Sequence, residues 1–151
     1  MRIYLPATLD ELEPDVLTLT ARRAHAVTPA LRAVLPDEDD ESLEFAAQLA
    51  AADDSLALLA RRPDAPRLRL VVSVDVPDRA VVSVTDPDEL PSAVDLLDDL
   101  GREDVACVHV DEPEAEADVR RAVDGDETAL EALDERDLLW YDSTELGQIP
   151  R

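Results

Sequence analysis

The stretch Arg67-Leu-Arg-Leu-Val-Val-Ser-Val-Asp-Val76 alternates between two kinds of side chain. Leucine or valine occupies every second position from Leu68 to Val76. Because successive side chains of a β-strand point to opposite faces of its sheet, this pattern predicts a strand with one fully apolar face. The other face takes polar and charged residues and one valine, namely Arg67, Arg69, Val71, Ser73 and Asp75. Pro77-Asp78 predicts a turn into a second strand over 80–84, so we expect a central hairpin here.

A long helix is predicted over residues 41–61, ahead of this strand. Carboxylates precede it, and Arg61 and Arg62 end it before Pro63, so the charges at both ends match the helix dipole. Its apolar residues recur at spacings that place them on one helical face. We expect this face, which contains Phe45, Leu49, Ala52, Leu56 and Leu59, to be the buried one.

The remaining patterns predict further strands and helices around this pair. Apolar runs and alternations predict strands over 2–6, 24–27, 105–110 and 138–141. Helices are predicted over 29–35, 92–100, 114–124 and 127–136. Thr28-Pro29 caps the start of the first, Gly101 ends the second, and Gly125 separates the last two. Together these elements predict one α+β domain, residues 1–151, with a mixed β-sheet, a central hairpin and helices packed on it.

The segment after the first strand is less regular. Thr8-Leu-Asp-Glu11 is a capping box, in which the Thr8 hydroxyl and the Glu11 carboxylate satisfy each other's backbone donors. The helix that it opens must be short or kinked, because Pro14 cannot donate a hydrogen bond within it. Residues 15–24 fit no single type of element.

The composition limits the size of the fold and the classes of partner that the protein can bind. The chain has 151 residues, 46% of them hydrophobic, which is enough for one domain with a core. It carries 37 acidic residues against 14 basic ones, all arginine, for a formal net charge of −23. This charge disfavours binding to nucleic acid or to an anionic membrane surface. Strong GC pressure on codons or adaptation to high salt explains most of the acidity, so the charge alone identifies no partner.

The sequence also lacks the patterns of most established sites. Three glycines form no phosphate-binding loop, and one cysteine with two distant histidines forms no zinc site. The acidic runs that begin at Asp37 and Asp124 lack the central glycine of a calcium loop. We therefore expect no metal and no cofactor. With no leader segment and no apolar stretch of the ~18 residues that span a bilayer, the protein is expected to be cytoplasmic.

His109 and Cys107 are candidate functional residues because they share one face of the predicted strand over 105–110. A cysteine nucleophile activated by histidine is one interpretation, and a buried, inert cysteine is the favoured one. His109 lies toward the carboxyl end of its strand, where ligands often bind in α/β sheets. The competing interpretation is a histidine satisfied by the neighbouring carboxylates of Asp111 and Glu112.

Three of the four aromatic residues fall in the first and last predicted strands: Tyr4, Trp140 and Tyr141. They would lie close together if those strands pair or neighbour in the sheet. Trp140 and Tyr141 are consecutive, so they point to opposite faces, and one can anchor the core while the other meets a ligand or partner. The alternative is that all three fill an alanine-rich core.

Several segments resemble a known family. Met-Arg-Ile-Tyr-Leu-Pro-Ala-Thr (1–8), His-Ala-Val-Thr-Pro-Ala-Leu (25–31) and Leu-Leu-Trp-Tyr with the later Glu-Leu (138–146) are similar to an uncharacterised actinobacterial domain family. Asp75-Val-Pro-Asp78 is also similar, so the resemblance spans essentially the whole chain. It implies an actinobacterial cytoplasm and GC-rich coding, and it implies neither a cofactor nor a catalytic residue.

Two functions follow from these observations. The leading hypothesis is a non-catalytic interaction or regulatory module with a strongly acidic surface and a protein partner that is basic or apolar at its contact. The alternative is a small enzyme or ligand-binding domain, in which His25, Arg32 and Tyr141 act on a small anionic metabolite held by the arginine. DNA mimicry is a third hypothesis, and it requires the carboxylates to line one elongated face of the protein. The sequence predicts no particular oligomeric state.

Overall fold

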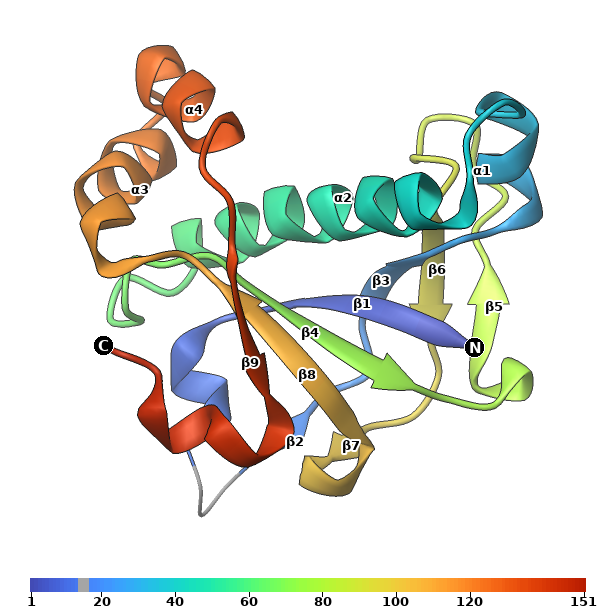
Figure 1. Ribbon diagram of the computed structural model, residues 1–151, viewed down its shortest axis with the longest axis horizontal. Helices are drawn as coiled ribbons and strands as arrows, with labels where there is room; N and C mark the ends of the chain where they lie inside the picture. Colours follow the sequence, from blue (N-terminus) through green and yellow to red (C-terminus); the bar gives the residue numbers. More distant parts are fainter. Residues whose placement is uncertain (14–16) are drawn as a thin grey trace.

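A seven-stranded sheet in the order β5-β6-β3-β1-β4-β8-β9 forms the centre of the molecule. It is seen in a computed structural model that describes residues 1–13 and 17–151 (Figure 1). Its strands are β1 (Arg2–Ala7), β3 (Arg23–Ala26), β4 (Leu70–Asp75), β5 (Val81–Ser83), β6 (Ala93–Leu96), β8 (Val105–Val110) and β9 (Leu139–Asp142). A second, two-stranded sheet pairs β2 (Thr18–Leu19) with β7 (Leu100–Gly101).

In the described part of the chain, four α-helices accompany the sheet: α1 (Pro29–Val34), α2 (Asp40–Ala60), α3 (Glu116–Val123) and α4 (Glu127–Asp134). The long helix α2 lies across one face of the sheet, and α3 and α4 lie beside each other near the C-terminal end of α2 (Figure 1). Short 3₁₀ helices cover Leu9–Leu12, Asp78–Ala80, Arg102–Asp104, Pro113–Ala115 and Ser143–Gln148. None of the helices among the described residues has the length and apolarity needed to cross a membrane.

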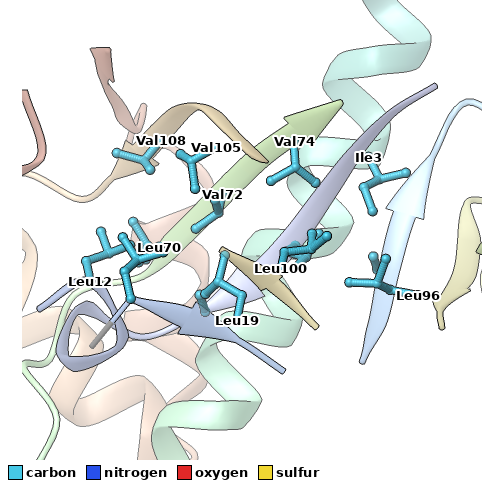
Figure 2. Close-up of a cluster of buried hydrophobic side chains, with 14 of the residues drawn as sticks. Ile3, Leu12, Leu19, Leu70, Val72, Val74, Leu96, Leu100, Val105 and Val108 are labelled. Carbon is cyan, nitrogen blue, oxygen red and sulfur yellow. The ribbon is translucent and has the colours of Figure 1, made fainter. Parts of the chain in front are cut away.

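The main hydrophobic core lies on the sheet face opposite α2. The predicted apolar face of the stretch 67–76 is confirmed, since Leu68, Leu70, Val72, Val74 and Val76 are all buried there. Leu12 and Leu19 cover these side chains from the 3₁₀ helix Leu9–Leu12 and from β2, as Figure 2 shows. Val71, from the polar face, packs instead with Tyr4 and α2 on the other side of the sheet.

The α+β class and the helices packed on a single main sheet are confirmed, but the sheet is not mixed. All pairings among the described strands are antiparallel. The mostly apolar run Val105–Val110 predicts a strand buried on both faces, as is common in parallel sheets. In β8 the core face carries Val105, Val108 and Val110, whereas Cys107 and His109 lie on the other face, toward α2.

The predicted central hairpin is wrong. β4 pairs with β1 and β8, whereas β5 pairs with β6 at the edge of the sheet. Six residues of β1 match β4 along its whole length, so both sides of β4 are already occupied by longer strands. The residues after Pro77 form a 3₁₀ helix that leads the chain away from β4.

The predicted helix over 92–100 is also wrong, because these residues form β6 and β7. Their apolar residues, which include Ala93, Val94 and Leu96, fit a short strand as well as a helix. The segment β6 pairs with β3 on one side and with β5 on the other, and this pairing stabilises the strand over the helix. Tertiary context therefore overrides the local pattern.

The helix over 41–61 is confirmed as α2, but the predicted buried face is only partly correct. Alanines and Leu43 form most of the buried side, whereas Phe45 and Leu49 are exposed. Alanine has no bulk beyond its Cβ, so the alanine side lets α2 sit close to β1. The large apolar residues at 45 and 49 are left on the flank of the helix.

The predicted caps at Thr8, Thr28 and Gly125 hold, whereas Gly101 ends no helix and lies in β7. Glu11 Oε2 accepts hydrogen bonds from the Thr8 N–H (2.9 Å) and hydroxyl (3.3 Å) at the start of a 3₁₀ helix. Thr28 Oγ1 accepts from the Leu31 N–H at the start of α1. Gly125 has a φ of 93°, which favours glycine, between α3 and α4. The expected effect of Pro14 lies outside the described residues.

Candidate functional site

An elongated groove runs between α2 and the β8–β9 edge of the sheet. Two adjoining hollows of about 460 and 320 Å³ form it, and they share Phe45, Gln48 and His109. We call this the α2–β9 groove. Its first hollow also reaches Leu133 and Leu138 near α4, and its second reaches Arg2, Tyr4, Ser73, Cys107 and Trp140.

Large apolar side chains line the groove and remain open to solvent. Phe45 is 52% exposed and Leu49 44% on α2, and Trp140 is 57% exposed on β9. Trp140 points into the groove because Tyr141, the next residue, packs against the main core on the other face, as the strand alternation predicts. Across the sheet Trp140 is the register partner of His109.

Free carboxylates surround these apolar side chains. In the described part of the chain, no ion pair involves the five acidic residues that line the groove: Glu41, Glu44, Asp53, Asp134 and Asp137. Burial first, and then the Asp134 charge, raise the pKa of Asp53. The groove therefore concentrates negative charge.

The arginines of the groove are already paired. Arg69 is buried and bound to Asp111 at 2.8 Å. Arg136 contacts Glu112 at 2.5 Å and also Asp118, and Arg2 contacts Asp75 at 2.9 Å. These cations are paired with carboxylates outside the groove, and Arg69 also acts on Asp53, whose pKa its charge lowers against the larger effect of burial.

His109 lies at the centre of the groove and lines both hollows. Its Nδ1 is buried, and no described residue hydrogen-bonds to it. The expectation that Asp111 and Glu112 satisfy this histidine is wrong, because they bind Arg69 and Arg136 instead. Burial lowers the pKa of the imidazole, so the ring is neutral at pH 7.

His109 is expected to make the protein less stable in mild acid. Its pKa is lower in the folded than in the unfolded chain, so below the ordinary value of about 6.5 the unfolded chain binds a proton that the folded chain does not. The free energy of unfolding therefore falls as the pH drops through this window. His109→Gln removes this titration, and its urea-unfolding free energy should decline less from pH 7 to pH 5 than that of the wild type. Parallel declines would contradict this assignment.

The comparisons with known proteins add a family. The model for "Family of unknown function (DUF6912)" matches residues 1–149. The chain belongs to this family. Comparison with curated proteins and with solved structures gave no match. The resemblance to an uncharacterised family is thus confirmed at this level, while the actinobacterial source and the proposed motifs stay predictions.

This DUF6912 chain brings three of the predicted site residues together: Tyr4, His109 and Trp140 all line the second hollow of the groove. The first and last strands are nevertheless not neighbours, because β4 and β8 lie between β1 and β9. Tyr4 and Trp140 share the hollow because both lie on the α2 side of the sheet. Burial raises the pKa of Tyr4 to about 12, so its hydroxyl stays protonated.

The other predicted site residues lie elsewhere. His25 is the register partner of Tyr4, but α2 covers it. Arg32 is exposed on α1 and binds Asp40 at 2.8 Å. Tyr141 lies against the core on the opposite face of the sheet. His25, Arg32 and Tyr141 therefore line no common hollow among the described residues.

His25 belongs to a chain of polar side chains that has the composition of a nucleophilic triad. Its Nδ1 lies 2.8 Å from Ser92 Oγ and its Nε2 lies 2.7 Å from Asp54 Oδ2. The burial is the reverse of a catalytic arrangement, because Ser92 is 3% exposed whereas the Asp54 side chain is 42% exposed. A substrate cannot reach the serine, and the chain instead ties β3 to α2 and to the start of β6.

Sequence reasoning missed the α2 side of the groove. Phe45 and Leu49 were assigned to the buried face, and the carboxylates were not connected with any aromatic residue. The available signal was the run of alanines at 46, 47 and 50–52. Small residues mark the helix face that approaches a sheet closely, which leaves larger apolar residues to its flank. Among the described residues, no group of three or more potential ligands is placed to hold a metal ion.

Proposed function

We propose that this DUF6912 domain is a non-catalytic interaction module, which binds a polypeptide with cationic and apolar side chains in the α2–β9 groove. The observation that supports this proposal is the pairing of half-exposed Phe45 and Trp140 with unpaired carboxylates along one groove. Tryptophan is enriched among the residues that dominate binding energy at interfaces. Exposed aromatic side chains also gain about 25 cal/mol for each Å² of apolar surface that a partner covers.

Charge complementarity favours a basic partner. The groove residues Glu44, Asp53 and Asp137 have no cationic partner among the described residues, so arginine or lysine side chains of a partner would neutralise them. Such pairing speeds association and selects against acidic partners. An acidic or phosphorylated ligand would meet repulsion in the same place.

Catalysis has weaker support in this groove. Cys107 and His109 line the same hollow, but no hydrogen bond joins them in the described part of the chain. An activated cysteine needs a base within hydrogen-bond reach or another cause of a lowered pKa. Cys107 is also buried, so little of its sulfur is exposed to a substrate.

A small anionic metabolite remains the second candidate. It is favoured by a separate hollow of about 370 Å³ beside Asp54, which three arginines line: Arg22, Arg23 and Arg61. Arg22 is paired with Glu11 at 2.6 Å, and Arg23 with Asp95 at 2.6 Å and Glu89 at 2.9 Å. Of these three arginines, Arg61 alone forms no ion pair among the described residues, so this hollow attracts anions less than its composition suggests.

Selection from a random twelve-residue peptide library tests the groove directly. Peptides are selected at about 0.15 M salt, and those that also bind the Phe45→Ala/Trp140→Ala protein are discarded, which removes purely electrostatic binders. We expect the selected peptides to be rich in arginine or lysine and in large apolar residues. Phe45→Ala and Trp140→Ala should each weaken binding of the best peptide at least about tenfold by calorimetry.

Matched variants separate the groove from general acidity. Val82→Ala removes an apolar side chain of similar exposure on β5, and we expect it to leave the affinity unchanged. Glu44→Gln/Asp137→Asn should weaken binding more than Asp86→Asn/Asp88→Asn, which removes the same charge from an exposed loop. If no peptide discriminates the wild type from Phe45→Ala/Trp140→Ala, or if both charge pairs act equally, the proposed function is wrong.

A further inference from the structure

The strand β9 forms one edge of the main sheet, and within residues 1–13 and 17–151 it pairs with β8 alone. An edge strand offers unpaired backbone groups to another chain, and proteins commonly protect such edges with charges, proline or bulges. β9 has none of these in its first three residues, Leu139-Trp-Tyr141, and its exposed side chains are apolar. The opposite edge, β5, has three residues and follows the charged 3₁₀ helix Asp78–Ala80.

The hydrogen bonding shows which backbone groups of β9 face outward. The Asp142 N–H donates to Glu145 Oε1 at 3.0 Å rather than to β8. In an antiparallel pair, residues alternate between those that bond the neighbouring strand and those whose N–H and C=O point away from it. Trp140 is two residues before Asp142, so its N–H and C=O also point to the free edge.

Trp140 therefore contributes to two surfaces at once. Its indole lines the groove, and its backbone N–H and C=O lie on the adjoining free edge of the sheet. A strand added beside β9 would pair with this backbone and would place every second side chain on the groove side, next to the indole. The carboxylate of Asp137 lies just before β9 and lines the same groove.

We propose that the partner segment binds in an extended conformation, as an additional strand hydrogen-bonded to β9 through Trp140. This inference rests on the proposed function and specifies how the basic, apolar segment is held. Backbone pairing provides affinity that does not depend on sequence, while the groove selects the side chains at alternate positions. A helix lying in the groove would use the same side chains but not the edge of β9.

An N-methyl scan of the best selected peptide distinguishes these two modes. Each methyl group removes one backbone N–H of the peptide without changing its side chains. If the peptide adds to β9, methylation should weaken binding by about tenfold at every second central residue and have little effect at the residues between. A helical peptide would lose affinity at consecutive central positions, because methylation disrupts each turn.

Hydrogen exchange of the Trp140 amide provides an independent readout. We expect its exchange to slow at least about tenfold when the peptide is bound, while the exposed Val82 amide region on the opposite edge stays unchanged. Peptide binding with no alternation in the scan and no protection of Trp140 would overturn the strand-addition inference and leave the proposed function intact. Failure to select any groove-dependent peptide would overturn both.

Discussion

Asp111→Asn is expected to lower the free energy of unfolding by about 3–5 kcal/mol, more than any other single change proposed for this protein. The Asp111 carboxylate accepts three hydrogen bonds from Arg69: from its backbone N–H at 2.8 Å, from Nε at 2.9 Å and from Nη2 at 2.8 Å. Both side chains are almost fully buried, at 5% and 0% exposure. The asparagine leaves the buried guanidinium without its hydrogen-bonded counter-charge.

A matched variant isolates the effect of burial. Asp75 binds Arg2 through two hydrogen bonds of 2.9 Å, also between neighbouring strands, but this pair is exposed. Asp75→Asn should therefore cost at most about 1 kcal/mol, because solvent screens exposed ion pairs. Urea unfolding followed by circular dichroism gives both values.

A double substitution tests whether the missing counter-charge causes the loss. Arg69→Met/Asp111→Leu removes both charges and keeps the volume roughly constant, so it should be considerably more stable than Asp111→Asn. If the double variant is no more stable than the single one, the two residues contribute through their individual packing. The assignment of an unpaired buried charge would then be wrong.

This pair also shows what the sequence predicts well and what it does not. The alternation in the stretch 67–76 places Arg69 on the polar face of its strand, and the structure agrees. It does not predict that this polar position is buried, because burial depends on α4 and on the residues after β8. Asp111 was for the same reason assigned to His109, its neighbour in sequence, rather than to Arg69, its neighbour in space.

The residues of the candidate site also fall into those that the sequence predicts and those that it does not. Trp140 and His109 are predictable because strand alternation assigns each to a face, and the face determines whether a side chain meets the core or the groove. Phe45 is not predictable from helical spacing alone, because alanine and phenylalanine both count as apolar although only alanine permits close approach to the sheet. The order of the strands is a non-local property, so the separation of β1 from β9 could not be read from either strand.

Ser55 connects the long helix to the sheet in a way that local patterns cannot reveal. It lies on the buried side of α2 and is fully buried. Its Oγ donates to the Ala7 carbonyl at 2.7 Å and accepts from the Leu70 N–H at 3.0 Å. Ala7 and Leu70 are register partners at the end of the β1–β4 pairing, so one hydroxyl completes the hydrogen bonds of two strands.

Ser55→Ala is expected to lower the free energy of unfolding by about 2–4 kcal/mol. The substitution leaves a buried donor and a buried acceptor unpaired, and each unsatisfied group costs about 1–3 kcal/mol. Ser83→Ala, on the exposed strand β5, makes the same chemical change and should stay within about 0.5 kcal/mol of the wild type. Urea unfolding at pH 7 measures both.

Amide hydrogen exchange identifies the origin of the Ser55 effect. If the hydroxyl satisfies the Leu70 N–H, exchange of that amide should accelerate in Ser55→Ala by more than the change in global stability explains. Equal acceleration at all core amides would indicate a general loss of packing against α2 instead. A loss below about 0.5 kcal/mol would mean that water replaces the hydroxyl, which the full burial of Ser55 argues against, since a bridging water needs room beside the two backbone groups.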